Sequence, residues 1–344
     1  MVTVKDIARL AGVSLGTVDR VIHNRGRVAA DTAARVQQAI TTLGYSPNLH
    51  ARQLSHGRTY RIALLMPDLS SDGGYWDEAY QGIERARSQL NLKQIEVQPT
   101  FFDRNTDAPV LRWIDHLAKA VESPPDGVIV APVVSTVAQN SLAQTLQRLR
   151  IPAVAFDSPL YGGSFPFVGQ DPEEGGRAAA RLTTLLSPPQ KTIVLITRGR
   201  QDAHLVSRSE ACATHVAALG NWPTASITID DQHDAAYVAA LTKKLQELGP
   251  AVGAIFVTNA GAHLVVQARS QAALPQPVPI VGYDLMRANA ELLRQGLIDF
   301  IISQRPETQG YEAAMMLINH LLFEVPLSDR ISMPVEVILP ETVK

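Results

Sequence analysis

The chain has 344 residues, of which 46% are hydrophobic and 19% are charged, and its formal net charge is −2. This length predicts two or three domains with sizeable apolar cores, and the composition excludes a disordered or fibrous chain. No apolar run reaches the ~18 residues of a membrane span, and the N-terminus lacks the basic start and apolar core of a signal peptide. Cys212 is the only cysteine, which excludes an internal disulfide and fits the cytoplasm, where we expect the protein to reside.

Charge is distributed unevenly along the chain. Residues 1–60 contain eight Lys and Arg residues against three Asp residues, a net charge of +5, so the remainder carries −7. A basic end joined to an acidic body indicates a segment that binds nucleic acid and a body that need not contact phosphate. A solvated basic face is the alternative, and the helical pattern of the basic segment favours DNA binding.

Two short helices with a tight turn between them are predicted at the start of the chain. Apolar residues recur at helical spacing over residues 4–11. Gly12 then supplies the positive φ that a tight turn requires, and Ser14 is a suitable N-cap for a second helix with an apolar inner face. This order is that of the helix-turn-helix unit, whose second helix enters the DNA major groove.

Two further helices are predicted before the main body of the chain. The third helix is capped by Asp31 or Thr32 and ends at Gly44. Ser46 as N-cap and Pro47 as first helical residue then predict a short fourth helix. The expected parts are a DNA-binding domain, a short helix with its linker, and a large body: residues 1–46, 47–60 and 61–344.

From residue 61 onward, apolar runs alternate with helical patterns. The expected strands are Ile62–Met66, Ile95–Phe101, Gly127–Ala131, Ala153–Phe156, Thr192–Thr197, Ala225–Ile229, Ala254–Val257 and Ile280–Tyr283. Helical patterns separate them at Asp77–Leu90, Ala108–Glu122, Val137–Leu149, Glu174–Leu186, Ser207–Leu219, Ala235–Leu248 and Ala262–Ala273. This alternation predicts an α/β fold with parallel sheets that helices cover on both faces.

The body is expected to form two lobes, each a doubly wound parallel sheet. We place the first crossing between the lobes at Tyr161–Pro166. The strand Leu297–Ser303 and the helix Glu307–Phe323 are assigned to the first lobe, and Met333–Leu339 to the second. The expected lobes are about residues 61–160 with 292–323, and about 161–291 with 324–344. Several crossings form a hinge, and ligands of open α/β sheets bind in the crevice at the carboxyl ends of the strands.

Polar and aromatic side chains follow several of these strands. The candidates for a ligand site are Tyr75, Trp76, Asp157, Arg208, Asn259, Asp284 and Gln304. Each has an ordinary explanation by itself, and Asp157 and Asn259 could simply cap the next helix. Together, two carboxylates, two amides and a guanidinium beside aromatic rings suit a polyhydroxylated ligand, because hydroxyls both donate and accept hydrogen bonds.

Sequence motifs along the chain resemble the lactose-repressor (LacI/GalR) family of bacterial transcription regulators. In the basic segment these motifs are TVKDIAxxAGVS at residues 3–14, TVxRV at 17–21 and LGYxPNxxARxL at 43–54. In the body they are FDS at 156–158, VSRSEAC around Arg208, VTNAG at 257–261, GYDLM at 282–286 and ISQRPETQGYEAA at 302–314. The resemblance implies a helix-turn-helix domain, a hinge helix and a sensor domain similar to periplasmic sugar-binding proteins.

The resemblance implies DNA contacts for ten residues. They are Thr3, Lys5, Ser14, Leu15, Gly16, Thr17, Arg20, Asn48, Arg52 and Leu54. Arg20 is expected to read a guanine, the commonest specific contact of Arg. Leu15 and Gly16 match the other two base-reading positions and offer few hydrogen bonds, so we expect an unusual half-site. Leu54 of the hinge helix is expected to wedge into the minor groove.

The resemblance also makes the seven strand-end residues contacts of a monosaccharide or related polyol in the interlobe cleft. Two places differ from the family: Ala211-Cys212 stands where Gly-Phe is common, and His233 or Asp231 replaces an aromatic residue. The implied protein is an allosteric repressor that binds a near-palindromic operator as a homodimer, without cofactor or metal. Induction and co-repression by the effector are both compatible with these residues.

A sugar-acting enzyme and a solute-binding receptor for transport are the alternative functions. Asp157 and Asp284 could form a glycosidase pair. However, Cys212 has no catalytic context, and no GxSxG motif, phosphate-binding loop or metal-spaced His cluster is present. A transport receptor would carry an export signal and no helix-turn-helix. We therefore expect a regulator and not an enzyme.

Overall fold

The computed structural model describes residues 4–22, 28–43, 58–89, 94–104, 106–133, 135–199, 202–230, 233–274 and 277–343. The chain divides into two compact units, residues 1–58 and 59–344. Several residues singled out above lie outside the described part: Thr3, Gly44, Ser46, Pro47, Asn48, Arg52, Leu54 and Asp231. The predicted hinge helix, residues 47–54, therefore lies outside it as well.

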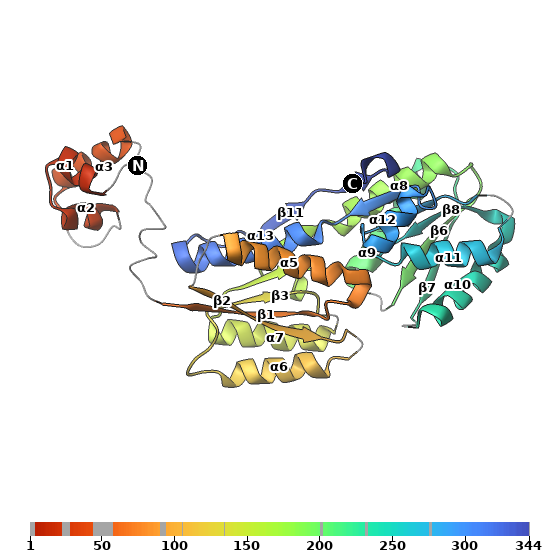
Figure 1. Cartoon of the computed structure of the whole chain (residues 1–344), viewed down its shortest axis with the longest axis horizontal. Coiled ribbons are helices and arrows are strands. Elements are labelled where there is room, and N and C mark those ends of the chain that lie inside the picture. Colours follow the sequence, from red (N-terminus) through yellow and green to blue (C-terminus); the bar gives the residue numbers. More distant parts are fainter. Residues whose placement is uncertain are drawn as a thin grey trace. The chain divides into compact units, whose positions relative to one another are not determined.

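The described part of the first unit is a bundle of helices (Figure 1). They are α1 Val4–Ala11, α2 Leu15–Ile22 and α3 Ala30–Leu43. Their apolar sides meet in a core around Ile7, Val18 and Val36, each of which is 0% exposed. The predicted helical periodicity therefore buries one side of each helix and leaves the opposite side in water.

The turn and caps of the first unit agree with the prediction except at α3. Gly12 has a φ of 64°, and Ser14 Oγ accepts a hydrogen bond of 3.2 Å from the backbone N–H three residues later. The prediction that Asp31 or Thr32 caps the third helix is wrong, because that helix already begins at Ala30. Asp31 lies in the first turn instead, where its negative charge interacts favourably with the helix dipole and stabilises the helix.

The first lobe of the second unit is a sheet with the strand order β11-β5-β4-β3-β1-β2, and all of its pairs are parallel. Its strands are β1 Tyr60–Pro67, β2 Ile95–Phe102, β3 Gly127–Val130, β4 Ala153–Phe156, β5 Phe167–Gln170 and β11 Arg330–Met333. Helices α5 Tyr75–Gln89 and α13 Pro306–Phe323 cover one face (Figure 1), and α6 Ala108–Lys119 and α7 Thr136–Leu149 cover the other. Short 3-10 turns lie at η1 Ser71–Gly74 and η2 Tyr161–Gly163.

The second lobe is a sheet with the order β12-β10-β9-β8-β6-β7, in which only the β10–β12 pair is antiparallel. Its strands are β6 Thr192–Arg198, β7 Thr224–Ile229, β8 Val252–Val257, β9 Ile280–Tyr283, β10 Phe300–Ser303 and β12 Glu336–Ile338. Helices α8 Pro172–Leu186 and α9 Ala203–Leu219 pack on one face, and α10 Asp234–Leu248, α11 Ala262–Ala272 and α12 Arg287–Arg294 pack on the other. Short 3-10 turns lie at η3 Gly249–Ala251 and η4 Pro340–Thr342. None of the helices in the described part of the chain is long and apolar enough to cross a membrane.

Three strands, β5, β10 and β11, lie in the opposite lobe from the one predicted for their residues. β5 follows Tyr161–Pro166 but pairs with β4, so the first crossing comes after Gln170 and not at that segment. The strand Leu297–Ser303 contains β10, which pairs with β9 of the second lobe and not with the first. Met333–Leu339 is not one strand, because β11 ends in the first lobe before β12 begins in the second. Such short, fully buried strands carry no alternation that would identify their sheet.

The three crossings between the lobes are held together by one amide. Gln170 Nε2 donates hydrogen bonds to the backbone oxygens of Ser303, at 3.1 Å, and Pro334, at 3.0 Å. Its Oε1 accepts a hydrogen bond from the Tyr283 hydroxyl. Gln170, Ser303 and Pro334 each lie at the end of a different crossing strand, so this buried side chain fixes the hinge from which the cleft opens.

Candidate functional site

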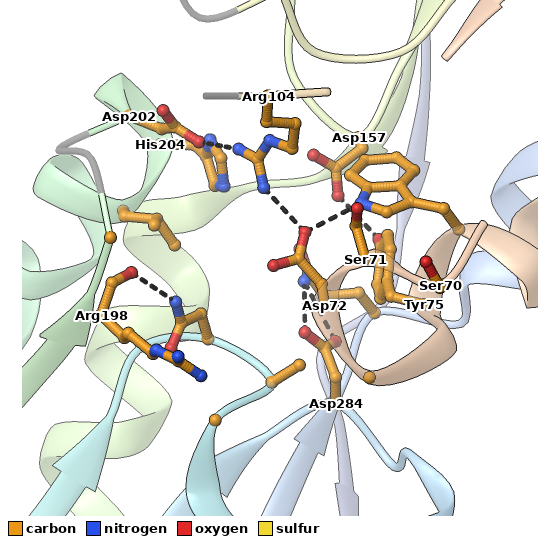
Figure 2. Close-up of a pocket in the computed structure, with 18 of the residues that line it drawn as sticks. Ser70, Ser71, Asp72, Tyr75, Arg104, Asp157, Arg198, Asp202, His204 and Asp284 are labelled. Atoms are coloured by element: carbon orange, nitrogen blue, oxygen red, sulfur yellow. Dashed lines mark hydrogen bonds and ion pairs between the residues drawn. The ribbon is translucent and has the colours of Figure 1, made fainter. Parts of the chain in front are cut away.

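A cavity of about 430 Å³ lies where the strands of both lobes end. All seven residues that the sequence singles out in the body line it: Tyr75, Trp76, Asp157, Arg208, Asn259, Asp284 and Gln304. Figure 2 shows Tyr75 and Asp157 of the first lobe together with Asp284 of the second around this space. The topology therefore brings side chains from strands far apart in the sequence into one site, as expected for open α/β sheets.

The first-lobe wall is built on Asp157 and Tyr75. Asp157 directly follows β4, and its Oδ1 accepts a hydrogen bond of 2.7 Å from the hydroxyl of Tyr75 at the start of α5. Gln309 Nε2 donates to the same hydroxyl at 3.3 Å, and the Trp76 ring lies edge-on to Tyr75 with 4.9 Å between ring centroids. Burial raises the pKa of the Asp157 carboxyl, although the hydrogen bond from Tyr75 opposes the rise. Neither aromatic residue is more than 3% exposed.

The second-lobe wall is a relay of hydrogen bonds. Gln304 Nε2 donates to both carboxylate oxygens of Asp284, at 3.0 and 3.1 Å, and Gln304 Oε1 accepts from Arg208 Nη2 at 2.9 Å. The Arg208 guanidinium also lies 3.7 Å from the ring centroid of Tyr283. Burial raises the pKa of Asp284 to about 7, although Arg208 lowers it. Arg208 Nε is buried and has no partner among the described residues, so a donor remains for a ligand.

Asn259 completes the second-lobe wall. Its Nδ2 donates to the backbone oxygen of Arg198 at 2.9 Å, while its buried Oδ1 has no hydrogen-bond partner among the described residues. The next helix, α11, is capped by Gly261 and not by Asn259. Asp157 likewise does not cap the following 3-10 turn, whose N-cap is Leu160. The capping explanation therefore fits neither residue.

Several charged residues and two histidines of the cavity were not found by the sequence analysis. They are Asp72, Asp103, Arg104, Arg198, Asp202, His204, Asp234 and His263. Arg104 lies two residues after β2, so the strand-end search could have included it. His233 is the N-cap residue of α10 and does not line the cavity, whereas its neighbour Asp234 does and forms an ion pair of 2.7 Å with Arg198.

The cavity offers hydrogen-bonding groups rather than metal ligands. Among the described residues, no group of His, Cys, Asp and Glu side chains is placed to hold a metal ion. Cys212 is 0% exposed in the core beneath α9, and burial raises the pKa of its thiol to about 12. It is therefore an uncharged core residue at neutral pH.

The first unit presents a polar surface at its helix-turn-helix. Lys5, Ser14, Gly16 and Arg20 are exposed, and Leu15 is 48% exposed. The hydroxyls of Ser14 and Thr17 lie 2.9 Å apart at the start of α2. These six residues are those for which the sequence predicts DNA contacts in the described part of this unit.

Comparison with known proteins gives two family matches. Residues 62–324 match the family model of the periplasmic binding protein domain, and residues 3–48 match that of the bacterial regulatory proteins, lacI family. The HTH-type transcriptional regulator DegA of Bacillus subtilis is 29% identical over 181 residues, which are 52% of this chain and 50% of DegA. The chain thus matches about half the length of this relative.

Two further proteins match over nearly the whole chain. The ribose operon repressor of Bacillus subtilis is 27% identical, and the alignment covers 100% of this chain and 99% of that protein. A solved complex of the transcriptional regulator CelR with cellobiose has a TM-score of 0.63 at 24% identity, covering 98% of this chain and 99% of CelR. The similarity to CelR shows that the two proteins share a fold.

Proposed function

Since the chain belongs to the lacI family of bacterial regulatory proteins and carries a periplasmic binding protein domain, we propose that it is a DNA-binding transcription repressor controlled by a small molecule. The effector is a monosaccharide or related polyol, bound in the interlobe cavity. The observation that carries this proposal is the presence of a helix-turn-helix and a polar interlobe cavity in one chain. A solute receptor for transport has no use for a helix-turn-helix. A relative that matches over the full length of this chain is the ribose operon repressor of Bacillus subtilis.

The charges around the cavity favour an uncharged polyol over a sugar acid or sugar phosphate. The described guanidinium groups are already engaged: Arg104 with Asp72 and Asp202, Arg198 with Asp234, and Arg208 with Gln304 and the Thr258 backbone oxygen. Asp157 and Asp284, in contrast, accept hydrogen bonds only from uncharged donors among the described residues. Ligand hydroxyls can donate to such carboxylates, whereas an anion would be repelled. One known relative is named for ribose, and another, from Streptococcus mutans, is the sucrose operon repressor.

We assign effector contacts to the seven strand-end residues named above, with Tyr75 and Trp76 against the apolar face of the sugar ring. We assign DNA contacts to the exposed residues of α1 and α2 and to the predicted hinge helix, residues 47–54. The protein acts as a homodimer on a near-palindromic operator, since two-fold dimers match two-fold half-sites. A DNA-binding regulator of this kind acts in the cytoplasm.

The test combines an electrophoretic mobility-shift assay with a ligand screen. The protein should retard DNA from its own upstream region in the gel. One sugar or polyol in a thermal-shift panel should raise the melting temperature of the protein and also change the amount of DNA that is retarded. Arg208→Ala serves as the matched control, because it should lose the effector response and keep DNA binding. Light scattering should give a dimer. Failure to bind any upstream DNA would refute the regulator, and thermal shifts that survive in Arg208→Ala would move the effector site elsewhere.

A further inference from the structure

We propose that Arg104 is a positioning residue that latches the two lobes together, and that it sets how far the cleft is closed before an effector binds. The proposal rests on the proposed function, because it concerns the regulation of the same cavity. No sequence motif identifies Arg104, whose role follows from contacts between the lobes.

The guanidinium of Arg104 contacts both lobes. Its Nη1 donates to Asp72 Oδ2 at 2.7 Å, and Asp72 belongs to the η1 turn of the first lobe. Its Nη2 donates to Asp202 Oδ2, and Asp202 is the N-cap residue of α9 in the second lobe. Figure 2 shows Arg104 between these two carboxylates. One side chain from the first lobe therefore forms a charge bridge across the cleft.

Burial makes this bridge stronger than a surface ion pair. The Asp202 side chain is 6% exposed and the Arg104 side chain 23% exposed. Charges that are largely removed from water attract each other more strongly than solvated ones, and removal of one partner weakens the stabilisation of the charge that remains buried. Without the guanidinium, Asp202 would regain water most easily if the lobes moved apart.

A second contact crosses the cleft beside the first. Ser158, directly after Asp157 in the first lobe, has its Oγ 2.8 Å from Nδ1 of His204 in the first turn of α9. Burial, together with Arg208 and Arg104, holds the pKa of His204 well below its usual range, so the ring is neutral. Both bridges end on residues 202–204, so the N-terminus of α9 is where the first lobe holds the second.

Arg104 is also placed to sense the effector. It lines the cavity, and its guanidinium carbon lies 5.9 Å from the centroid of the Trp76 ring. Its Nε is buried and has no hydrogen-bond partner among the described residues. A ligand hydroxyl that accepts from Nε would therefore strengthen a latch that is already formed, and effector binding and lobe closure would share one residue.

The experiment measures the distance between the lobes in the full chain without effector. Spin labels are placed at Val137→Cys on α7 of the first lobe and at Lys244→Cys on α10 of the second, and both positions are exposed. The native Cys212 is 0% exposed and stays unlabelled. We expect one short distance in the otherwise unaltered chain, and a longer, broader distribution in Arg104→Ala and in Asp202→Asn. The double variant should match the single ones, because both remove the same interaction.

Arg198→Ala is the matched control. It removes an Arg–Asp pair that lines the same cavity but joins β6 to α10 within the second lobe, so the interlobe distance should not change. Rescue by the conservative variant gives a second readout that a purely structural role would not move. Arg104→Lys keeps the positive charge but not the planar fork that reaches both carboxylates, so it should restore only part of the short distance that Arg104→Ala loses.

The proposal fails if Arg104→Ala keeps the distance distribution of the unaltered chain, or if Arg198→Ala opens the lobes equally. Asp202→Asn keeps the shape of the side chain and covers the case in which Arg104→Ala does not fold. Failure of the proposed function would look different, because the DNA shift would be absent in every variant whatever the interlobe distance.

Discussion

Asp284 illustrates how the cavity changes the chemistry of a single side chain. Burial raises the pKa of its carboxyl from 3.8 to about 7, and the negative charges of Asp157 and Asp72 add to the rise. Arg208 and the hydrogen bonds from Gln304 oppose it. Because this pKa lies above that of the unfolded chain, folding favours the protonated carboxyl.

We therefore predict that Asp284 makes the effector-free protein less stable as pH rises. Its contribution to the free energy of unfolding is complete at pH values below the unfolded pKa near 3.9, and it is lost as pH rises through the folded pKa of about 7. The total contribution that is lost is at most about 4 kcal/mol. Asp284→Asn should remove this slope from the free energy of unfolding. Urea titrations between about pH 4.5 and about pH 8 would measure it. If both proteins lose stability with the same slope, Asp284 is not the group that titrates.

Arg20 and Lys5 should affect DNA binding in different ways. Arg20→Ala should cost about 1–3 kcal/mol on the specific site and flatten the discrimination at one base pair, because a base contact is lost. Lys5→Ala should weaken binding to all sequences alike and lower the salt slope by about 1, because a phosphate contact is lost. Anisotropy titrations on a panel of operator variants separate the two. An Arg20→Ala protein with full discrimination would exclude Arg20 as a base-reading residue.

The sequence predicted the residues of the cavity better than their partners. Searching directly after strands finds Asp157, Asn259 and Asp284, because parallel strands end at the same edge of a sheet. The search misses the pair of Arg104 and Asp202, which are 98 residues apart and meet only because the lobes face each other. Arg104 itself follows a strand, but its pairing with Asp202 depends on tertiary placement, which the local sequence around either residue does not reveal.

At the scale of elements, strand positions were easier to predict than strand partners. Ala153–Phe156 is a strand over the predicted residues, because an apolar run ends at polar Asp157. β5 was not predicted as a strand, and its residues and those of β10 were assigned to the wrong lobe, because a four-residue buried strand fits either sheet by composition. The hydrogen bonds that decide the sheet come from residues distant in sequence, such as Val281 opposite Phe300.

The packing of α5 against α13 requires two glycines that face the opposite helix. A Cβ atom on Gly310 would lie 2.0 Å from the backbone oxygen of Ala79, and one on Gly82 would lie 1.9 Å from that of Glu307. No side chain can move away to relieve these contacts, because the clashing atoms are backbone. The two helices would have to separate, which would disturb the first-lobe core between them and β4.

We predict that Gly310→Ala lowers the free energy of unfolding by at least about 1–3 kcal/mol, although Ala is the better helix former. Gly261→Ala is the matched control, since a Cβ atom there would lie 3.5 Å from its nearest neighbour, an ordinary contact. Denaturant unfolding of both variants provides the comparison. Equal stability of the two would show that α5 and α13 can separate at little cost.

At the scale of the whole molecule, the helix-turn-helix and the cavity lie in different compact units. An effector can change operator affinity only through different affinities for two arrangements of the protein. Gln170 ties the crossings between the lobes of the second unit, and we expect the lobes to take two such arrangements about this hinge. The segment around Leu54 joins the units in sequence and resembles the family's hinge helix, so we expect it to transmit the difference.

Linkage makes this coupling measurable from both sides. If the effector changes operator affinity by some factor, the operator must change effector affinity by the same factor, and typical factors are about 5–150. We predict that Leu54→Ala brings both factors toward one, because the wedge that distinguishes the bound arrangement is lost. Effector affinity of the DNA-free protein should stay unchanged, since the cavity lies in the other unit. Calorimetry with effector, carried out with and without operator DNA, gives one factor, and anisotropy with DNA gives the other. If Leu54→Ala left both factors at their original values, the coupling would run through an element other than the hinge segment.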